Sequence, residues 1–417
     1  MQIEKYTFGV GDRFAHEGRA QLSAIQAAAQ DGIRIHPVWN KSNREHTIIG
    51  SEPRDVRTEA DAAVAALGWN APYYVDADHV GLKTVDRFIE ASDFYTLDVA
   101  DFTGHAAPAA EIERFAAAME RWVGPLSIAG LAEPIEITAE IIRGTAEKFL
   151  LAIQEAGRIY RHVVEKKGAD RFITEVSVDE TNSPQTPVEL FLILAMISQQ
   201  GIPAQTIAPK FTGRFNKGVD YVGDLARFEQ EFDADLSVIA FAIAEFGLPA
   251  SLKLSVHSGS DKFSLYPIIN RLIKKHRTGL HVKTAGTTWL EEVIGLAEAG
   301  GEGLAIAREV YREALAHFDE LTGPYATVID IDRTRLPSPE EVEKWDSDTY
   351  VRTLRHVQAD PKYNSNFRQL IHVGFKIAAK MGARYPDALK QHEAIIARNV
   401  RENLLDRHIR PIFKGTE

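Results

Sequence analysis

Imidazole and carboxylate side chains stand together in one short stretch of the sequence, Asp76-Ala77-Asp78-His79. Hard and borderline divalent metal ions accept both kinds of ligand. The stretch alone is explained equally well as a solvated loop in which Asp76 or Asp78 caps the next helix. Whether it forms a metal site therefore depends on further ligands that the fold brings close to it.

Two more histidines lie at or near the ends of later apolar runs. His257 directly follows one run, and His281 lies within the next. A single core histidine is more often hydrogen-bonded than metal-bound, but neighbouring strands are about 4.8 Å apart, so two inward histidines on such strands can share an ion. We predict one divalent metal ion bound by His79, Glu180, His257 and His281. These ligands suit zinc, manganese, nickel or cobalt better than calcium, which prefers oxygen alone.

Carboxylates and lysines close to these ligands are candidates for proton transfer. Asp179 and Glu180 are adjacent, so one can bind metal while the other moves protons, although Asp179 is also explained as a helix cap. Lysines follow three successive apolar runs, where a desolvated amine can act as a general base, form a Schiff base or bind a substrate carboxylate. The predicted catalytic residues are Asp78, Asp179, Lys210 and Lys283.

Arginines, a lysine and a serine near the same ends are candidates for substrate binding. Arginine binds a carboxylate through two parallel hydrogen bonds, although each arginine alone is more often part of a surface salt bridge. The stretch Ser258-Gly259-Ser260 is suited to present backbone donors to an oxyanion. Together these residues indicate an anionic small-molecule substrate. The predicted substrate-binding residues are Arg13, Arg214, Ser258 and Lys262, with Arg44 as a further anion-binding candidate.

The elements that would position these residues are strands alternating with helices. Eight short apolar runs each end in a polar cluster and are followed by a helical stretch, a pattern typical of a (β/α)8 barrel. In such a barrel the active site lies at the carboxyl ends of the strands, where the polar clusters are. The predicted strands are residues 6–10, 33–38, 72–75, 94–99, 172–178, 202–208, 252–256 and 280–282.

An open, doubly wound sheet is the alternative architecture, because residues 325–332 also have the pattern of a strand and would displace one of the eight. Polar residues at every second position favour the barrel. Glu175, Ser177 and Asp179 share one face of the fifth run, whereas a strand buried in an open sheet is normally apolar on both faces. We therefore predict an α/β protein with a TIM-type (β/α)8 barrel.

Two stretches are additional to the barrel. About 70 residues separate the fourth strand from the fifth, more than an ordinary crossover needs, and residues 112–122 and 135–164 have helical patterns. After residue 335 the chain is polar and helical to its end. We predict a catalytic barrel domain over residues 1–335 with a helical insertion at about 104–170, and a helical C-terminal extension over 336–417 that packs on the barrel.

Composition excludes several other kinds of protein. The 417 residues contain no cysteine, so disulfides and thiolate ligands are ruled out. A net charge of −11 and the lack of a basic run argue against nucleic acid as a partner. No bilayer-spanning run and no signal-peptide pattern are present, so we expect a cytoplasmic protein without a membrane partner. Gly9-Val10-Gly11 lacks the third glycine of a dinucleotide fingerprint and there is no P-loop, so no nucleotide cofactor is expected.

Several longer motifs resemble those of the tagaturonate/fructuronate epimerase family. The resemblance extends from about residue 6 to about residue 381 and implies a metal-dependent, cytoplasmic epimerase of keto-uronates in hexuronate catabolism. Some members of that family also act on neutral ketohexoses. The resemblance leaves open whether the protein is a homo-oligomer. The motifs are GVGDRF at residues 9–14, VDADH at 75–79, HSGSDK at 257–262, HVKTAG at 281–286 and NFRQLIHVGF at 366–375.

The implied reaction places its own demands on the site. Tagaturonate and fructuronate differ at a carbon two bonds from the ketone, where the proton is not acidic, so enolisation alone does not invert the centre. Retro-aldol cleavage and re-addition needs a metal ion and a base, whereas transient oxidation needs a hydride carrier. The missing dinucleotide fingerprint favours the retro-aldol route. The alternatives are a metal-dependent sugar aldolase or aldose–ketose isomerase on the same barrel and, in another class, a non-catalytic sugar-binding protein.

Overall fold

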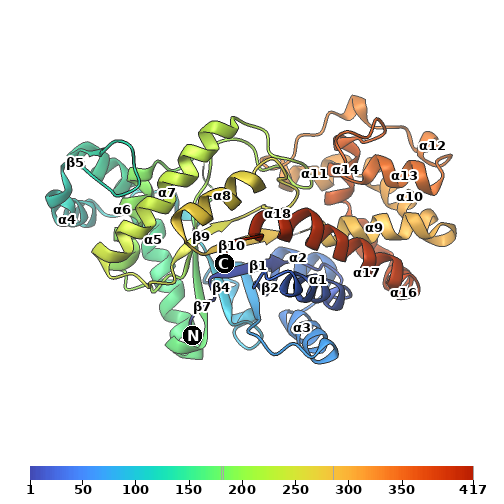
Figure 1. The fold of residues 1–417 in the computed structure, drawn as a ribbon, viewed down its shortest axis with the longest axis horizontal. Coiled ribbons are helices and arrows are strands. Elements are labelled where there is room, and N and C mark those ends of the chain that lie inside the picture. Colours follow the sequence, from blue (N-terminus) through green and yellow to red (C-terminus); the bar gives the residue numbers. More distant parts are fainter. Residues whose placement is uncertain (180, 182, 285, 417) are drawn as a thin grey trace.

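Eight parallel strands form a closed barrel in the computed structural model, which describes residues 1–179, 181, 183–284 and 286–416. Around the barrel the order is β1, β2, β3, β4, β7, β8, β9 and β10, and β10 pairs with β1. Figure 1 shows helices around these strands. The predicted (β/α)8 barrel is therefore confirmed. The strands are β1 (Tyr6–Val10), β2 (His36–Ser42), β3 (Tyr74–Val80), β4 (Phe94–Asp98), β7 (Ile173–Ser177), β8 (Thr206–Ala208), β9 (Lys253–Val256) and β10 (Leu280–Thr284).

Two strands continue further toward the carboxyl end than the apolar runs do. The sequence prediction ended the second and third strands at residues 38 and 75, whereas β2 reaches Ser42 and β3 reaches Val80. Their last residues are polar because they face the barrel interior and its mouth, where Asn40 lies beside Asp76 in register. A prediction from hydrophobic runs detects only the part of a strand that packs against apolar neighbours, and it therefore ended β2 and β3 too early.

Helices surround the barrel, and two of them are buried on nearly every side. In α6 every residue from Leu190 to Ile197 is buried, and in α9 every residue from Thr287 to Ala297. A helix that is covered all round lies beneath another layer. The helices that follow the strands are α1 (Gly18–Gln30), α3 (Pro53–Leu67), α5 (Ala139–Lys167), α6 (Pro187–Gln199), α7 (Leu225–Phe246), α8 (Tyr266–His276) and α9 (Thr287–Ala299).

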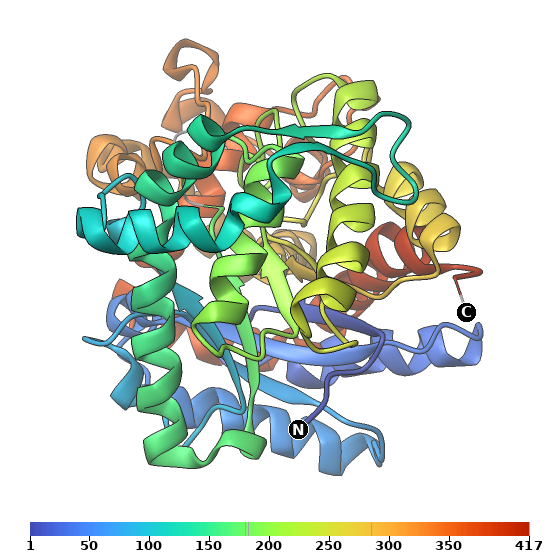
Figure 2. The same cartoon turned by 90° about the vertical axis from the view of Figure 1, so that its left-hand side faces the viewer.

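The insertion after β4 covers α6. It contains α4 (Ala109–Met119) and an antiparallel hairpin of β5 (Gly124–Leu126) and β6 (Ile135–Ile137), which Figure 2 shows lying across α6 and α7. Trp122 packs edge-on against Phe191 of α6 and Phe241 of α7. Residues 135–137 were predicted to be helical, but they form β6, and α5 begins after Thr138, whose hydroxyl accepts the Ile141 amide hydrogen bond.

The helices near the C-terminus cover α9 and complete the outer layer. Helix α13 (Ser347–Leu354) and helix α17 (Glu393–Glu402) pack on α9, and α17 also packs on α1. The π-helical segment η7 (Asn403–Ile409) and α18 (Arg410–Phe413) then run between α1 and α8 (Figure 1). There Phe413 contacts Tyr6 of β1, with the two ring centroids 5.4 Å apart. The chain end thus covers β1. A domain boundary at residues 335 and 336 stays a prediction.

Residues 325–332, which also had the pattern of a strand, do not join the sheet. Side chains of α14 (Ser365–Val373) bind their backbone instead. Gln369 accepts a hydrogen bond from the Asp330 amide and donates one to the Asp330 carbonyl, both at 2.9 Å, and Asn366 accepts one from the Asp332 amide at 2.8 Å. The segment therefore forms a loop close to the barrel mouth.

Candidate active site

A cleft of about 570 Å³ opens at the carboxyl ends of the barrel strands. Its walls come from β2 and α2 (Asn43–Ile49), the ends of β3 and β4, helix α5, and the segments that follow β7, β8 and β9. This is the end of the barrel at which enzymes of this fold carry their active sites. The polar and charged residues lining it include Asn40, Arg44, Asp78, His79, Lys83, Asp98, Glu155, Asp179, Lys217, His257, Ser258 and Lys283.

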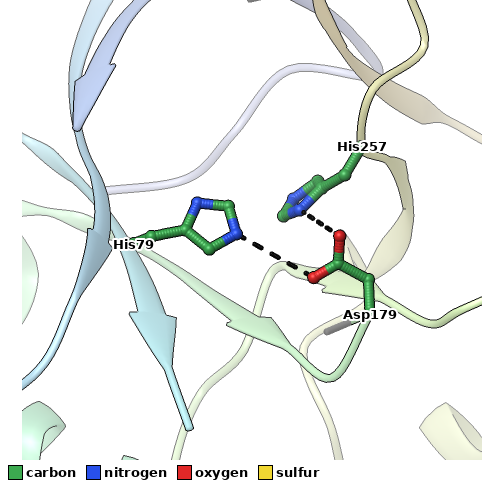
Figure 3. A group of neighbouring side chains, drawn as sticks. All are labelled: His79, Asp179 and His257. Atoms are coloured by element: carbon green, nitrogen blue, oxygen red, sulfur yellow. Dashed lines mark ion pairs between the residues drawn. The ribbon is translucent and has the colours of Figure 1, made fainter. Parts of the chain in front are cut away.

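Two histidines and one carboxylate meet at the floor of the cleft (Figure 3). Each of His79, Asp179 and His257 offers a ligand atom, and these atoms lie within 4.8 Å of one another. His257 Nδ1 is 3.2 Å from Asp179 Oδ2, and His79 Nε2 is 3.9 Å from Asp179 Oδ1. Each residue comes from the end of a different strand. Two imidazoles and a carboxylate are a common ligand set for zinc and similar borderline cations.

An irregularity in β3 turns His79 into the cleft. The register between β3 and β4 shifts between Ala77 and Val80, and His79 has a φ of 55°. Because side chains alternate along a strand, a regular β3 with Asp76 and Asp78 facing inward would point His79 outward. Ser258, directly after His257, has a φ of 49°. Left-handed backbone at non-glycine residues is costly and tends to occur at functional sites.

A buried ammonium group lies close to the histidines. Lys283 Nζ is 2.7 Å from Asp76, 2.8 Å from Asp78 and 3.0 Å from Glu175, and it also donates to the Thr96 hydroxyl. Burial opposes the charge of Lys283, but the three carboxylates outweigh it and hold its pKa well above the usual range. Burial raises the pKa of Asp76 to about 7 despite the neighbouring lysine. The cluster therefore carries a lasting positive charge at its centre.

The same carboxylates orient the two histidines. Asp78 Oδ1 is 2.9 Å from His79 Nδ1, and Glu175 Oε1 is 2.7 Å from His257 Nε2. With one ring nitrogen held in this way, the other nitrogen of each ring faces Asp179. His257 Nδ1 is buried and, within the part of the chain that the structure describes, has no aligned hydrogen-bond partner despite its closeness to Asp179. A buried polar atom of this kind fits a metal ligand, and the donor set as a whole fits a divalent cation.

The tagaturonate epimerase family model, UxaE, matches residues 1–409. The chain belongs to this family. It is 29% identical over 422 residues to the tagaturonate/fructuronate epimerase of Thermotoga maritima, a match that covers 97% of this chain and 80% of that protein. The native crystal structure of the fructuronate-tagaturonate epimerase UxaE from Cohnella laeviribosi superposes with a TM-score of 0.79 at 25% identity, covering 99% of this chain and 82% of the other. The crystal structure of the same Cohnella laeviribosi protein with one glycerol bound superposes with a TM-score of 0.77 at 24% identity, again covering 99% of this chain and 82% of the other.

Of the other two predicted ligands of this epimerase, His281 does not join the group at the cleft floor. His281 lies beside Ser255 in register, two residues earlier along the strand than His257, so its ring is one layer deeper. Its Nδ1 is 2.8 Å from the Thr7 hydroxyl, and burial lowers its pKa to about 3. Glu180, the neighbour of Asp179, lies outside the described residues, so its part in binding metal stays a prediction.

Two of the predicted lysines do not line the cleft. Lys262 is buried, and its amine donates to the backbone carbonyls of Asn216 at 2.9 Å and Val219 at 2.8 Å. Burial lowers the pKa of Lys262 to about 8. The amine of Lys210 donates to the backbone carbonyl of Thr181. Both amines connect segments of the barrel rim, whereas Lys283 and Ser258 lie in the cleft as predicted.

Two predicted arginines also lie outside the lining of the cleft. Arg13 is buried, pairs with Glu45 and stacks on the Phe375 ring with its guanidinium 4.0 Å from the centroid. Arg214 is half exposed and pairs with Asp330 at 2.9 Å. Arg44 does line the cleft. Sequence alone cannot distinguish these arginines, because it does not show which of them already has an acidic partner.

Sequence reasoning missed several residues that line the cleft. Asn40 is buried, and among the described residues neither its side-chain nitrogen nor its side-chain oxygen has a hydrogen-bond partner. Asp98 ends β4, two residues after the inward Thr96, and so shares its face. Period-two alternation extended to the ends of β2 and β4 would have found both residues. Glu155 of α5 and Lys217 after β8 give no comparable signal, because neither belongs to a strand.

Replacing Lys283 tests how strongly the buried cluster depends on its positive charge. We expect Lys283→Met to lower the free energy of unfolding by about 3–5 kcal/mol, because it leaves buried carboxylates without their partner. Lys275→Met is the matched control, since Lys275 pairs with Asp233 at the same 2.7 Å but its side chain is 52% exposed. The Lys275→Met substitution should lower the free energy of unfolding by less than about 1 kcal/mol. Urea unfolding of both variants measures the difference, and equal losses would contradict the assignment.

Proposed function

We propose that the protein is a divalent-metal-dependent epimerase that interconverts D-tagaturonate and D-fructuronate. The observation that carries the proposal is the group of His79, Asp179 and His257 at the floor of the cleft, in a member of the tagaturonate epimerase family. These three residues would hold the metal ion, and Glu180 stays a predicted further ligand. Zinc, manganese, nickel and cobalt fit this ligand set better than calcium does.

The reaction we propose is retro-aldol cleavage followed by re-addition. A base removes the proton of the hydroxyl on the epimeric carbon, and the bond between this carbon and the carbon next to the ketone breaks. The electron pair passes to the ketone fragment as an enediolate, and the other fragment becomes an aldehyde. The aldehyde rotates, and the enediolate adds to its opposite face. The proton then returns to the new alkoxide, so that atoms and electrons balance without an external oxidant.

The residues around the cleft floor suit the charges of this reaction. A bound divalent cation would supply stabilisation of the negative enediolate oxygens. The Lys283 ammonium adds a fixed positive charge that does not need to reorganise during the reaction. Its amine is held by Asp76, Asp78 and Glu175, which argues against Lys283 as a Schiff-base nucleophile. The carbonyl bonds of Lys210 and Lys262 argue against them in the same role.

We propose Asp98 as the acceptor of the hydroxyl proton. The carboxylates predicted for this role have other partners: Asp78 contacts Lys283 and His79, and Asp179 contacts both histidines and the hydroxyl of Ser177. Asp98 lies on the inward face of β4 and lines the cleft. Its one hydrogen bond among the described residues comes from the backbone amide of Ala100. Its second carboxylate oxygen is therefore available to a substrate hydroxyl.

We further propose that Arg44 and Lys217 bind the carboxylate of the substrate. Both line the cleft, and both lie over the ring of the buried Tyr325, at 4.8 Å and 5.9 Å from its centroid. A shared aromatic platform holds the two cations on one side of the cleft. Asp98 of β4 and Glu155 of α5 line other parts of the cleft. This separation of charge would orient a keto-uronate with its carboxylate away from these two acidic side chains.

The proposed function is tested by following purified protein with D-tagaturonate by NMR. We expect fructuronate to appear, the reaction to stop when a chelator removes the metal, and activity to return when a divalent ion is added back. His257→Ala should lose bound metal and turnover together while the protein stays folded. Accumulation of free fragments would indicate an aldolase, carbonyl migration an isomerase, and binding without turnover a sugar-binding protein. Full activity in the presence of chelator would contradict the metal-dependent reaction.

Replacing Asp98 tests its role as the proton acceptor. We expect Asp98→Asn to lower kcat by about 10²- to 10⁴-fold, the usual contribution of a positioned base, with bound metal unchanged because Asp98 is not among the proposed ligands. Asp101→Asn is the control, since Asp101 lies in the same segment and also lines the cleft. Steady-state kinetics and metal analysis measure both quantities. A kcat within about threefold of the unmodified protein would assign the base elsewhere.

Replacing Arg44 tests recognition of the carboxylate. We expect Arg44→Gln to lower kcat/KM for tagaturonate by about 10- to 100-fold, the value of a hydrogen bond to a charged group, and to leave kcat/KM for a neutral ketohexose within about twofold. Arg54→Gln is the control, because Arg54 lies on α3 outside the cleft and is also exposed. Equal losses for the acidic and the neutral substrate would exclude a carboxylate contact.

A further inference from the structure

One motif of the family resemblance, residues 366–375, lies outside the cleft. Most of it forms helix α14, and none of its residues lines the cleft. Nevertheless Asn366, Arg368, Gln369 and His372 are all buried. Buried polar side chains are costly unless they are hydrogen-bonded, so these residues must have structural partners. Asn366 and Gln369 bind the loop of residues 325–332, as described above, and Arg368 has a different set of partners.

The Arg368 guanidinium binds two loops of the barrel rim at once. Its side chain is fully buried. Nε donates to the Gly218 carbonyl in the loop after β8, and Nη2 donates to Asp261 Oδ2 in the loop after β9 at 3.1 Å. Nη1 donates to the Leu354 carbonyl at the end of α13 at 2.9 Å. A planar fork of this shape can serve several acceptors in fixed directions, which lysine cannot do.

Both loops carry residues that line the cleft. Gly218 directly follows Lys217, and Asp261 lies three residues after Ser258 and four after His257. The loop after β9 contains two non-glycine residues with left-handed backbone, Ser258 at a φ of 49° and Asp261 at 61°. Such conformations persist only where surrounding contacts enforce them. The ion pair between Asp261 and Arg368 is one such contact.

Helix α14 is also in close contact with the rim. A Cβ atom at Gly218, where φ is 73°, would lie 3.1 Å from the His372 ring, and one at Gly286, where φ is 87°, would lie 2.4 Å from it. The loop after β8 and the turn that begins α9 therefore pack directly on α14. Helix α14, through Arg368 and His372, therefore contacts the segments that follow β8, β9 and β10.

We propose that Arg368 is a positioning residue of the epimerase, which fixes the loops after β8 and β9 and so aims His257 and Lys217 into the cleft. The proposal rests on the proposed function in assigning His257 to the metal ion. Arg368 binds Gly218, Asp261 and Leu354, and within the described part of the chain none of these lines the cleft or is a proposed metal ligand. Its loss should therefore change the affinity for metal and the mobility of the two loops, and not only the stability of the protein.

The test compares Arg368→Lys with Phe367→Leu, its neighbour in α14. Phe367 is buried against a different set of side chains: its ring stacks on Tyr311 with centroids 4.4 Å apart and lies 5.3 Å from the ring of Tyr350. Phe367→Leu therefore weakens the packing of α14 without removing a bond to the rim. The two readouts are amide hydrogen exchange in peptides 211–222 and 257–265, and the dissociation constant of Co²⁺ added to the metal-free protein.

For Arg368→Lys we expect exchange in both peptides to accelerate by at least about tenfold and Co²⁺ to bind at least about tenfold more weakly. Phe367→Leu should lower the melting temperature and leave both readouts within about twofold. Unchanged readouts in Arg368→Lys, or the same changes in Phe367→Leu, would overturn the proposal. If Arg368→Lys does not fold, Asp261→Asn removes the charge of the partner while keeping its shape and is judged by the same criteria. A failure of the unmodified protein to bind Co²⁺ would instead refute the proposed function, while the exchange data would still decide the role of Arg368.

Discussion

The arrangement of the site depends on one buried positive charge. Lys283 lies in the barrel interior among Asp76, Asp78 and Glu175, and its ammonium offsets part of the cost of placing these carboxylates so far from water. Asp78 and Glu175 in turn hold one nitrogen each of His79 and His257. The free nitrogens therefore face Asp179 in a defined geometry. Lysine, carboxylate and imidazole are thus connected in a chain of contacts, and each group orients the next.

The two additions to the barrel serve the site in different ways. The insertion after β4 covers the apolar helix α6, and its last helix, α5, supplies Glu155 to the wall of the cleft. The C-terminal helices cover α9 and include α14, whose buried side chains hold the loops at the rim. The register of the barrel strands sets how deep each predicted ligand lies, whereas the C-terminal helices hold the loops that follow β8 and β9. This division agrees with the general tendency of (β/α)8 enzymes to vary in loops and additions around a constant barrel.

Much of the fold was predictable, because eight apolar runs and the polar alternation within them report directly on a closed parallel sheet. The site was predictable in part. His79 and His257 were found from residue type and position at strand ends, but the depth of His281 depends on register, which sequence does not give. The bulge that turns His79 inward leaves no hydrophobic signature. Arg13 and Arg214 were chosen for their charge, and only the fold shows that Glu45 and Asp330 already pair with them. Pairing partners far apart in sequence cannot be inferred from composition or period.

The central claim is that Lys283 and its carboxylate partners orient His79 and His257 so that these histidines and Asp179 form one metal site. The most direct measurement is the anomalous diffraction of crystals grown with Zn²⁺ or Co²⁺, recorded at the absorption edge of the metal. The account predicts a single strong peak at the cleft floor, about 2.0–2.2 Å from His79 Nε2, His257 Nδ1 and an oxygen of Asp179. A peak bound by His281 in place of these atoms, or no peak at a saturating metal concentration, would contradict it.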